Sequence, residues 1–298
     1  MPKAAQNFFR ALRLPFITAS ILPFVFGSLI EKTNFKLLGF LLGLFCVAAT
    51  HLSANLINDY ADSKSGADCQ DKKFYGFFGG SKLIQEKILS ERFFLLAAIS
   101  FGILALLCAV LLAAALRNLF PFGIFLAIIA LSWLYSHKPL QFSYHRLGEM
   151  AIFLFFGPAP VMGGYFIQTG IFPDLKSFLL SLPFGFLTTA ILFVNEVPDF
   201  QEDSNAKKFT WVSIVGARRA FFIYALLILL AFGSIFLNIG LGNLKPAAVL
   251  SVIFLVPAFK AGVILKRFSQ EKMRLLESSK LAIAVQAFIS LVLIFGVL

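Results

Sequence analysis

Charge and cysteine are both scarce in this sequence. Charged residues make up 14% of its 298 positions, and the three cysteines, Cys46, Cys69 and Cys108, form no CxxC pair. An ordinary soluble domain carries about 25% charged residues, so the composition excludes that class. Cysteines so few, two of them inside apolar stretches, argue against disulfides and against a zinc site. The first apolar run continues without a small-residue cleavage pattern, so we expect no cleavable signal peptide.

Apolar residues, by contrast, are abundant and arranged in long runs. The sequence is 59% hydrophobic, contains 38 Phe and has a mean hydropathy of +0.87. A helix of about 20 apolar residues crosses the roughly 30 Å core of a bilayer. The sequence therefore predicts an all-α, polytopic protein of the lipid bilayer, with one domain over residues 1–298 and no nucleic-acid partner. Nine transmembrane helices are expected, near residues 11–30, 36–57, 92–115, 119–136, 148–168, 176–197, 219–240, 246–265 and 281–298.

Charged residues fall mostly on one side of the predicted membrane. The N-terminal segment and every second loop carry most of the Lys and Arg, whereas the other side holds Lys32, Lys36, Arg117, Lys176 and Lys245. Because basic loops are retained in the cytoplasm, this bias predicts a cytoplasmic N-terminus in an inner or plasma membrane. The acids follow the same division, with Glu31 and Asp174 as the exceptions. A face that gathers both signs of charge indicates a site on the cytoplasmic side.

The first acidic run lies at the end of the second predicted span, over residues 55–68. In a continuing helix, Asn55, Asn58, Asp59 and Asp62 are spaced i, i+3, i+4 and i+7, which places them on one face. Asp68 follows behind Gly66. Carboxylates this close together repel one another, so the stripe needs a proton or a bound cation.

The second acidic run ends the sixth predicted span. Asn195, Asp199 and Asp203 are spaced i, i+4 and i+8 and lie along one helical face. Both runs contain Asn, three residues, then Asp and an aromatic residue, each at the cytoplasmic end of an even-numbered span. We therefore expect two helices that present matched acidic stripes to one another.

The residue types in these runs indicate a particular ligand. Asp and Asn without thiolates form a hard oxygen set that suits Mg²⁺, and Mg²⁺ in proteins is commonly completed by phosphate oxygens. The Gly79-Gly80-Ser81-Lys82 turn adds backbone N–H groups and a lysine, a weak phosphate-site pattern on its own. The alternative, in which the acids only cap helix ends or pair with loop lysines, explains one run more easily than two matched runs. The inferred ligand is a diphosphate with an apolar remainder.

At this point the sequence resembles the UbiA superfamily of intramembrane prenyltransferases. The resemblance rests on Asn58-Asp59-Tyr60-Ala61-Asp62 with Asp68, and on Asn195, Asp199 and Asp203. It implies nine transmembrane helices around a central cavity, with two Asp-rich motifs that bind Mg²⁺ and an isoprenyl diphosphate.

Several details resemble the 1,4-dihydroxy-2-naphthoate enzymes of menaquinone synthesis within that superfamily. They are the late position of Asp68, the run Arg146-Leu147-Gly148-Glu149 followed by Phe155-Phe156-Gly157-Pro158, and the run Asn195-Glu196-Val197-Pro198-Asp199. Two stretches depart from that pattern, because Lys207-Lys208-Phe209-Thr210 replaces a Gly-Lys-Arg-Thr-like run and Tyr135-Ser136-His137-Lys138-Pro139 replaces a Tyr-Ser-Pro-Pro-like loop. These departures put the acceptor in question.

The resemblance implies a Mg²⁺-dependent transfer from a polyprenyl diphosphate to an aromatic acceptor. The expected metal ligands are Asp59, Asp62, Asp68, Asp199 and Asp203, and four of these, Asp59, Asp62, Asp199 and Asp203, are also the expected catalytic residues. The expected diphosphate contacts are Asn58, Lys82, Lys138, Arg146, Asn195 and Lys208. Tyr60, Tyr135 and Tyr144 are expected near the acceptor or the prenyl chain. No general base for the reaction with the acceptor can be named from the sequence.

Three other functions fit part of these observations. The nearest is a superfamily sibling that uses 4-hydroxybenzoate, a glycerol phosphate lipid, a porphyrin or a chlorin. A membrane cation transporter also places acids on its spans, but usually near the bilayer midplane. A CDP-alcohol phosphotransferase uses membrane Asp clusters with metal, and its contiguous Asp-Gly-Ala-Arg-rich signature is absent from this sequence.

Overall fold

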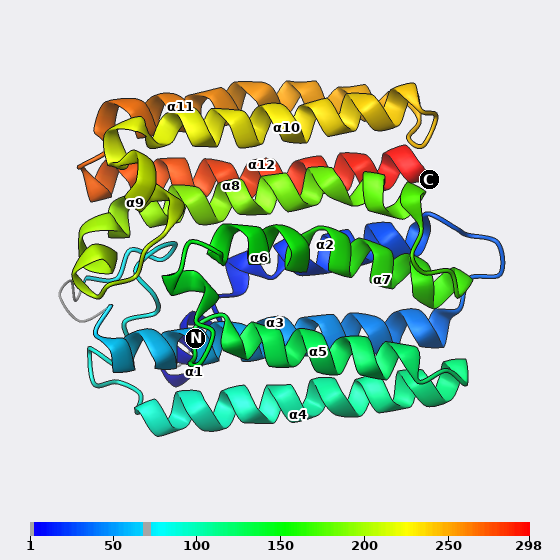
Figure 1. Cartoon of the computed structure of the whole chain (residues 1–298), viewed down its shortest axis with the longest axis horizontal. Helices are drawn as coiled ribbons and strands as arrows, with labels where there is room; N and C mark the ends of the chain where they lie inside the picture. Colours follow the sequence, from blue (N-terminus) through cyan, green and yellow to red (C-terminus); the bar gives the residue numbers. More distant parts are fainter. Residues whose placement is uncertain (1–2, 68–72) are drawn as a thin grey trace.

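The computed structural model describes residues 3–67 and 73–298, and every regular element within them is a helix. The long helices run side by side along the molecule (Figure 1). In chain order they are α1 (Lys3–Leu12), η1 (Leu14–Phe16), α2 (Thr18–Leu29), α3 (Leu37–Ser65), α4 (Glu91–Leu116), α5 (Phe120–Leu134), η2 (Phe142–Tyr144), α6 (Gly148–Phe156), α7 (Pro158–Thr169), α8 (Leu175–Asn205), α9 (Trp211–Val215), η3 (Ala217–Arg219), α10 (Ala220–Gly240), η4 (Pro246–Phe254), α11 (Leu255–Phe268) and α12 (Lys272–Val297).

Seven helical segments of the described chain are long and apolar enough to cross a membrane. They are Leu37–Ser65, Glu91–Leu116, Gly148–Thr169, Leu175–Asn205, Ala217–Gly240, Pro246–Phe268 and Lys272–Val297. The first predicted span belongs to a bent pair, Ala5–Leu12 with Leu14–Leu29, whose two parts meet at 41°. The fourth predicted span is α5, an apolar helix of 15 residues. All nine predicted stretches are thus helical, and seven of them qualify as spans by length and composition.

The predicted span at residues 148–168 is divided into two helices at the point where it packs against α8. Helix α6 ends at Phe156 and α7 begins at Pro158, with Gly157 between them. The missing N–H of proline is tolerated in a first helical turn. A Cβ on Gly157 would lie 2.7 Å from the backbone of Gly185 in α8, so only glycine permits this close approach. The break holds α6 and α7 against α8 and directs Phe155 and Phe156 into the space between the helices.

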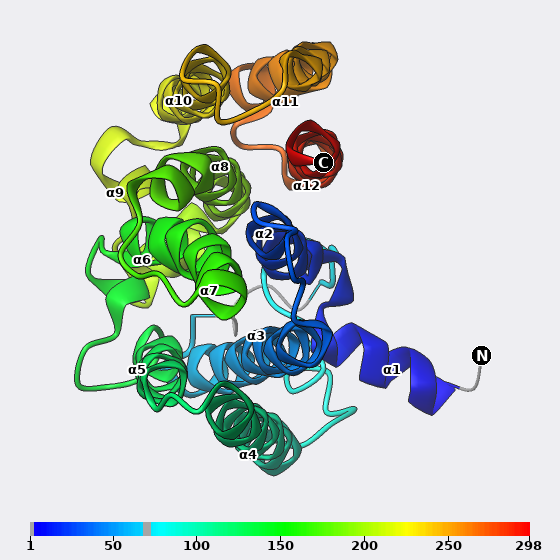
Figure 2. The ribbon, with the colours of Figure 1, turned by 90° about the vertical axis from the view of Figure 1, so that its right-hand side faces the viewer.

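An end-on view shows how the helices are grouped (Figure 2). Helices α3, α4 and α5 lie on one side, α8, α10, α11 and α12 on the other, and α2, α6 and α7 between them. Buried apolar clusters join these groups; in one of them the rings of Phe26 in α2 and Phe184 in α8 lie 4.8 Å apart. Large apolar side chains that remain exposed, such as Phe222, Leu229 and Phe259, suit helices whose outer faces meet lipid tails.

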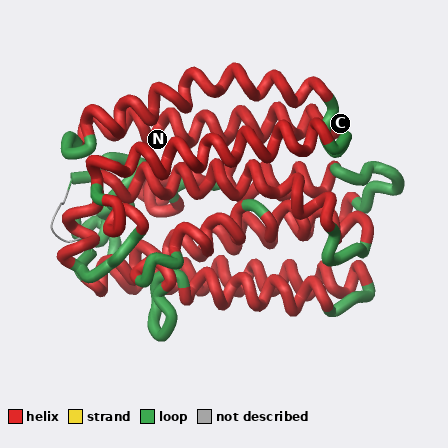
Figure 3. The backbone as a smooth tube through the Cα atoms, turned by 45° about the horizontal axis from the view of Figure 1, so that its top comes forward, coloured by secondary structure: helices red, strands yellow, loops and turns green. Residues whose placement is uncertain are grey.

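Loops gather at the two ends of the bundle (Figure 3). The C-terminal ends of α3 and α8 lie at the same end, on the left in Figure 1, together with α1, α9 and the loop that precedes α4. Both acidic runs lie on these two helix ends, because α3 continues to Ser65 and α8 to Asn205. Pro198 lies inside α8 without ending it. The helices thus bring the two predicted stripes to one place.

Candidate active site

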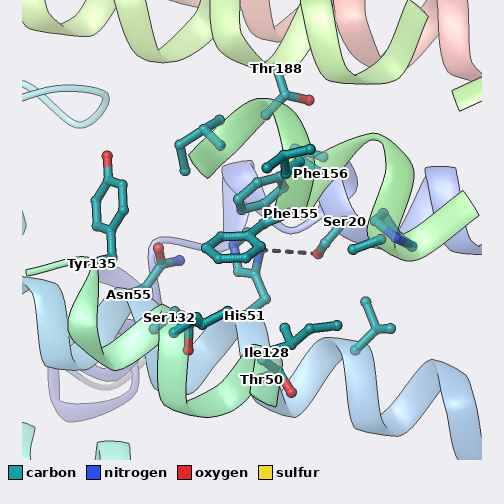
Figure 4. Close-up of a pocket in the computed structure, with 18 of the residues that line it drawn as sticks. Ser20, Thr50, His51, Asn55, Ile128, Ser132, Tyr135, Phe155, Phe156 and Thr188 are labelled. Atoms are coloured by element: carbon teal, nitrogen blue, oxygen red, sulfur yellow. Dashed lines mark hydrogen bonds between the residues drawn. The ribbon is translucent and has the colours of Figure 1, made fainter. Parts of the chain in front are cut away.

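A cavity of about 570 Å³ lies between α2, α3, α5, α6, α7 and α8. Its acidic end is lined by Asn58, Asp62, Asn195, Asp199, Asp203 and Lys208. The rest, which we call the apolar body, is lined mainly by rings and aliphatic chains such as Phe24, Ile128, Phe155, Phe156 and Ile167. Figure 4 shows part of this body, with His51, Asn55 and Thr50 below and Thr188 above. The cavity therefore joins a charged end to a long apolar space.

Asp62, in the first acidic run, lines the cavity. It is 4% exposed, and its carboxylate accepts hydrogen bonds from the Tyr144 hydroxyl at 2.8 Å and the Asn58 carboxamide at 3.3 Å. The oxygen of Asn58 accepts in turn from the Ser136 hydroxyl at 2.5 Å. Asp62 and Asn58 belong to α3, whereas Tyr144 and Ser136 belong to the loop after α5. That loop therefore fixes the direction of the first acidic stripe.

The loop before α4 contacts both acidic runs. The backbone N–H of Gly79 donates to Asp199 at 2.8 Å, and that of Ser81 donates to Asp59 at 3.1 Å. Gly79 and Gly80 have φ angles of 71° and 70°, in the left-handed region that favours glycine. The predicted Gly-Gly-Ser-Lys turn thus exists, and in this structure its amides bind the carboxylates.

Lys208 joins the two acidic runs directly. Its ammonium lies 3.4 Å from a carboxylate oxygen of Asp62 and 3.5 Å from one of Asp203. The side chain is 16% exposed and lines the cavity. A cation therefore sits between carboxylates from α3 and α8, which is the place where the sequence predicts a metal and a diphosphate.

The donor set suits Mg²⁺, because the acidic end offers carboxylate and carboxamide oxygens from Asn58, Asp62, Asn195, Asp199 and Asp203. Within the described parts of the chain, no three His, Cys, Asp or Glu side chains are already grouped closely enough to hold a metal ion. Lys208 occupies the space between two of these acids. Metal binding at this end would therefore require the ammonium to move.

One predicted metal ligand, Asp59, is not among the cavity-lining residues. Asp59 is 4% exposed and lies 3.5 Å from the guanidinium of Arg13, which itself lines the cavity. Asp68 lies outside the described residues.

The predicted phosphate contacts divide into two groups. Lys208 and the two asparagines line the cavity. Lys82 is 3% exposed and lines a small neighbouring pocket together with Asp199. Lys138 and Arg146 are exposed and do not line the cavity, and the Arg146 guanidinium lies 5.8 Å from the ring centre of Phe209. The structure thus brings Lys82 and Lys208 to the acids and leaves Lys138 and Arg146 on the surface.

The three predicted tyrosines also take different positions. Tyr135 lines the cavity, and Tyr144 donates to Asp62. Burial, and then the Asp62 carboxylate beside it, raises the pKa of Tyr144, which keeps its hydroxyl protonated as a donor. Tyr60 does not line the cavity; its ring packs 5.8 Å from that of His137.

Sequence reasoning missed two cavity residues. Arg13 belongs to the basic N-terminal segment, to which no role in the site was assigned, but its guanidinium lies 3.5 Å from the carboxylate of Asp59. His51 lies four residues before Asn55 on α3 and lines the cavity with it. Extending the acidic face back by one helical turn would have found His51, whereas nothing in the sequence connects Arg13 to the acids.

Comparisons with known proteins agree with this architecture. The UbiA prenyltransferase family matches residues 20–292. The chain is 29% identical over 234 residues to the UbiA prenyltransferase domain-containing protein 1 of Dictyostelium discoideum, covering 74% of this chain and 68% of that protein. It is 29% identical over 206 residues to the 1,4-dihydroxy-2-naphthoate octaprenyltransferase of Bacillus subtilis (strain 168), covering 68% of this chain and 64% of that protein, slightly less than two thirds of its length.

A solved structure shares the fold. It is a UbiA homolog from Archaeoglobus fulgidus bound to DMAPP and Mg²⁺, with a TM-score of 0.59, 17% sequence identity, and coverage of 97% of this chain and 99% of that one. At this identity the likeness shows the fold alone. Together with the match over residues 20–292, it establishes that the chain belongs to the UbiA prenyltransferase family, as an integral, multi-pass membrane protein.

Proposed function

We propose that this prenyltransferase transfers an isoprenyl group from a polyprenyl diphosphate to an aromatic acceptor, 1,4-dihydroxy-2-naphthoate, in menaquinone synthesis. The observation that carries the proposal is the cavity, in which acids from α3 and α8 meet around Lys208 at one end of an apolar space. A diphosphate suits the charged end, and a prenyl chain suits the apolar body. A cation transporter has no need of this apolar space.

The diphosphate would be bound at the acidic end with Mg²⁺. Asp62, Asp199 and Asp203 line the cavity and would hold the metal with Asp59 and Asp68, while Asn58 and Asn195 orient the ligands. Bound Mg²⁺ neutralises the charge that develops on the departing diphosphate. The solved relative from Archaeoglobus fulgidus, bound to DMAPP and Mg²⁺, supports this assignment by analogy.

Cations of the chain would share that task. Lys208 and Arg13 line the cavity, and Lys82 lies beside Asp199, so we assign these three to the diphosphate. Once metal and diphosphate bind, Lys208 can exchange its carboxylate partners for phosphate oxygens without leaving the site. Lys138 and Arg146 are left out of this set because they lie on the surface.

The apolar body would shield the reacting carbon from water. Loss of the diphosphate leaves an allylic cation, and aromatic faces stabilise positive charge at close range. Phe155, Phe156 and Tyr135 are the rings best placed for this role, because all three line the cavity. An electron-rich ring of the acceptor then attacks the cation, and the attacked carbon, which bears the carboxyl group in dihydroxynaphthoate, loses that group as CO₂.

The choice of acceptor rests on sequence likeness. The naphthoate-type features around Arg146, Phe155 and Asn195 agree with the match to the 1,4-dihydroxy-2-naphthoate octaprenyltransferase of Bacillus subtilis. Both acidic runs lie at one end of the bundle, and we propose that this end faces the cytoplasm, which the charge bias of the loops supports. We further propose that the bent pair ending in α2 and the short helix α5 also cross the membrane, for nine spans around the cavity.

An acceptor screen tests the proposal. Purified protein in lipid nanodiscs is incubated with Mg²⁺, one long prenyl diphosphate and separate acceptors: dihydroxynaphthoate, 4-hydroxybenzoate, a glycerol phosphate lipid and a porphyrin. We expect a prenylated product, detected by mass spectrometry, from dihydroxynaphthoate only, and none after EDTA. Product from another acceptor would identify a superfamily sibling, and undiminished product in EDTA would refute the metal assignment.

A further inference from the structure

His51 is a buried polar side chain in the apolar body of the cavity. It is 6% exposed and lines the cavity from α3, facing Phe155 and Phe156 (Figure 4). Its Nδ1 lies 3.0 Å from the hydroxyl of Ser20. Among the described residues, its Nε2 has no hydrogen-bond partner. A buried nitrogen left without a hydrogen bond destabilises the protein, so a partner from outside the chain is expected.

The hydrogen bonds around His51 indicate what Nε2 can do. The Ser20 hydroxyl also lies 3.1 Å from the carbonyl of Ile17, and it has a single proton to donate. Other hydroxyls of the cavity wall donate to carbonyls of their own helix, as Thr50 does to Cys46 and Ser132 to Ile129. If Ser20 does the same, its oxygen accepts from Nδ1–H of His51. Nε2 then carries the lone pair and accepts hydrogen bonds.

The position of His51 excludes the diphosphate as this partner. His51 precedes Asn58 by two helical turns, so it lies roughly 10 Å deeper along α3. A prenyl chain, which fills the apolar body, has no polar atom to offer. The remaining component of the reaction is the acceptor, whose ring hydroxyls are hydrogen-bond donors.

A second wall of the cavity carries a similar group. Thr188 of α8 is 5% exposed, and its hydroxyl has no hydrogen-bond partner within the described chain. Figure 4 shows it above the rings of Phe155 and Phe156, opposite His51. The hydroxyls of Ser20, Thr50 and Ser132, which also line the cavity, each lie within hydrogen-bond distance of a backbone carbonyl, so Thr188 differs from them.

We propose that His51 positions the aromatic acceptor by accepting a hydrogen bond from a ring hydroxyl at Nε2, with Thr188 as a second polar contact. Both atoms are covered by neighbouring side chains in this structure. The ring of Phe156 packs edge-on against the imidazole, with centroids 5.5 Å apart, and it turns aside when the acceptor enters. The hydrogen bond to Nε2 orients the aromatic ring of the acceptor. It also increases the electron density of that ring, which favours its attack on the allylic carbon. This inference rests on the proposed transfer to an aromatic acceptor.

Two substitutions of His51 distinguish a role in positioning the acceptor from a role in packing the cavity wall. The amide of Asn reaches the level of Nδ1, so His51→Asn keeps the contact with Ser20 and loses the group at Nε2. The longer His51→Gln places an amide at the level of Nε2. Ser234→Ala is the control, because it removes a buried hydroxyl that lies outside the cavity and whose bond to Ala231 of its own helix is already made.

The readout is the KM for 1,4-dihydroxy-2-naphthoate and, separately, for the prenyl diphosphate. We expect His51→Asn to raise the acceptor KM about tenfold, which corresponds to one hydrogen bond, and His51→Gln to stay within about threefold. The KM for the prenyl diphosphate should be unchanged in both, and Ser234→Ala should match the wild type. Equal acceptor KM values in the Asn and Gln variants, or a change in the prenyl diphosphate KM instead, would overturn the proposal.

Modified acceptors provide a second test, which uses only the wild-type protein and so does not depend on whether a variant folds. Each ring hydroxyl of dihydroxynaphthoate is blocked in turn as its methyl ether, and binding to the wild-type protein is measured by calorimetry. One ether should bind about tenfold more weakly than the parent compound. If both ethers bind as well as the parent, no hydroxyl donates to His51 and the inference fails. If the wild type transfers a prenyl group to no aromatic acceptor, the proposed function itself fails, which is visible before any variant is made.

Discussion

The two parts of the cavity hold their polar side chains in different ways. At the acidic end the bonds join residues far apart in the sequence, as when Tyr144 donates to Asp62 across 82 positions and Lys208 reaches the same carboxylate across 146. In the apolar body, Thr50 and Ser132 donate to carbonyls of their own helices, four and three residues back.

This difference reflects what each part has to do. A hydroxyl that binds its own helix is satisfied without regard to neighbours, so the wall around it can stay apolar. Carboxylates gathered for a charged ligand repel one another and need donors from several segments to stay in place. The acidic end is therefore sensitive to the arrangement of the loops, whereas the body depends mainly on helix packing.

Asp62→Asn should have the largest effect of the changes that test this contrast. It removes the negative charge that pairs with the Lys208 ammonium and accepts hydrogen bonds from Tyr144 and Asn58. We expect kcat for prenyl transfer to fall at least about a hundredfold, since losing one well-placed electrostatic group at an active site costs this much. Steady-state kinetics in nanodiscs with saturating Mg²⁺ would measure it.

Glu277→Gln is the matched control for that change. It also removes one negative charge, but from an exposed ion pair with Lys260 outside the cavity, so activity should be unchanged. Wild-type kcat in the Asp62→Asn variant would show that the acids merely pair with basic residues.

Tyr144→Phe should have an intermediate effect. It deletes a 2.8 Å hydrogen bond from a side chain that is 6% exposed, and so leaves Asp62 with one donor fewer. We expect the free energy of unfolding to fall by about 1–2 kcal/mol and kcat to fall several-fold. Thermal unfolding in detergent, read beside the kinetics, would test both. A loss of stability without any change in kcat would mean that the bond supports the fold only.

Ser132→Ala should have the smallest effect. Its hydroxyl lines the cavity but donates at 2.8 Å to Ile129 of the same helix, so no group in another segment loses a partner. We expect the free energy of unfolding to change by less than about 0.5 kcal/mol and kcat to be unchanged. A large loss of activity would remove the distinction between the two parts of the cavity.

Much of the fold could be predicted because membrane spans are long and uniformly apolar. Each of the nine stretches is helical, and α3 and α8 continue beyond the apolar run to include the acids, as the helical spacing of Asn55 to Asp62 and of Asn195 to Asp203 indicates. The break at Gly157 was not foreseen. It depends on the contact with Gly185, a residue 28 positions away that no local pattern connects to it.

The candidate site was predictable in its acids and less so in its cations. Acids spaced by helical turns indicate that they share one face of a helix. The position of a lysine in a loop does not indicate which residues it will contact. Arg146 matched a family pattern and Lys138 lies in a loop that departs from it, yet both lie on the surface. Arg13, from the basic N-terminal segment, lines the cavity and lies 3.5 Å from Asp59. Which loop folds back over the acids depends on contacts between segments that are remote in the sequence.

The sequence by itself determined the membrane class, the helical segments and the two acidic stripes, because hydropathy and a period of 3.6 residues are local properties. Only the tertiary structure decided which cations meet those acids and that Lys208 bridges α3 and α8. It also decided that Nε2 of His51 finds no hydrogen-bond partner among the described residues. These facts depend on distances across the bundle, which packing sets and spacing along the chain does not reveal.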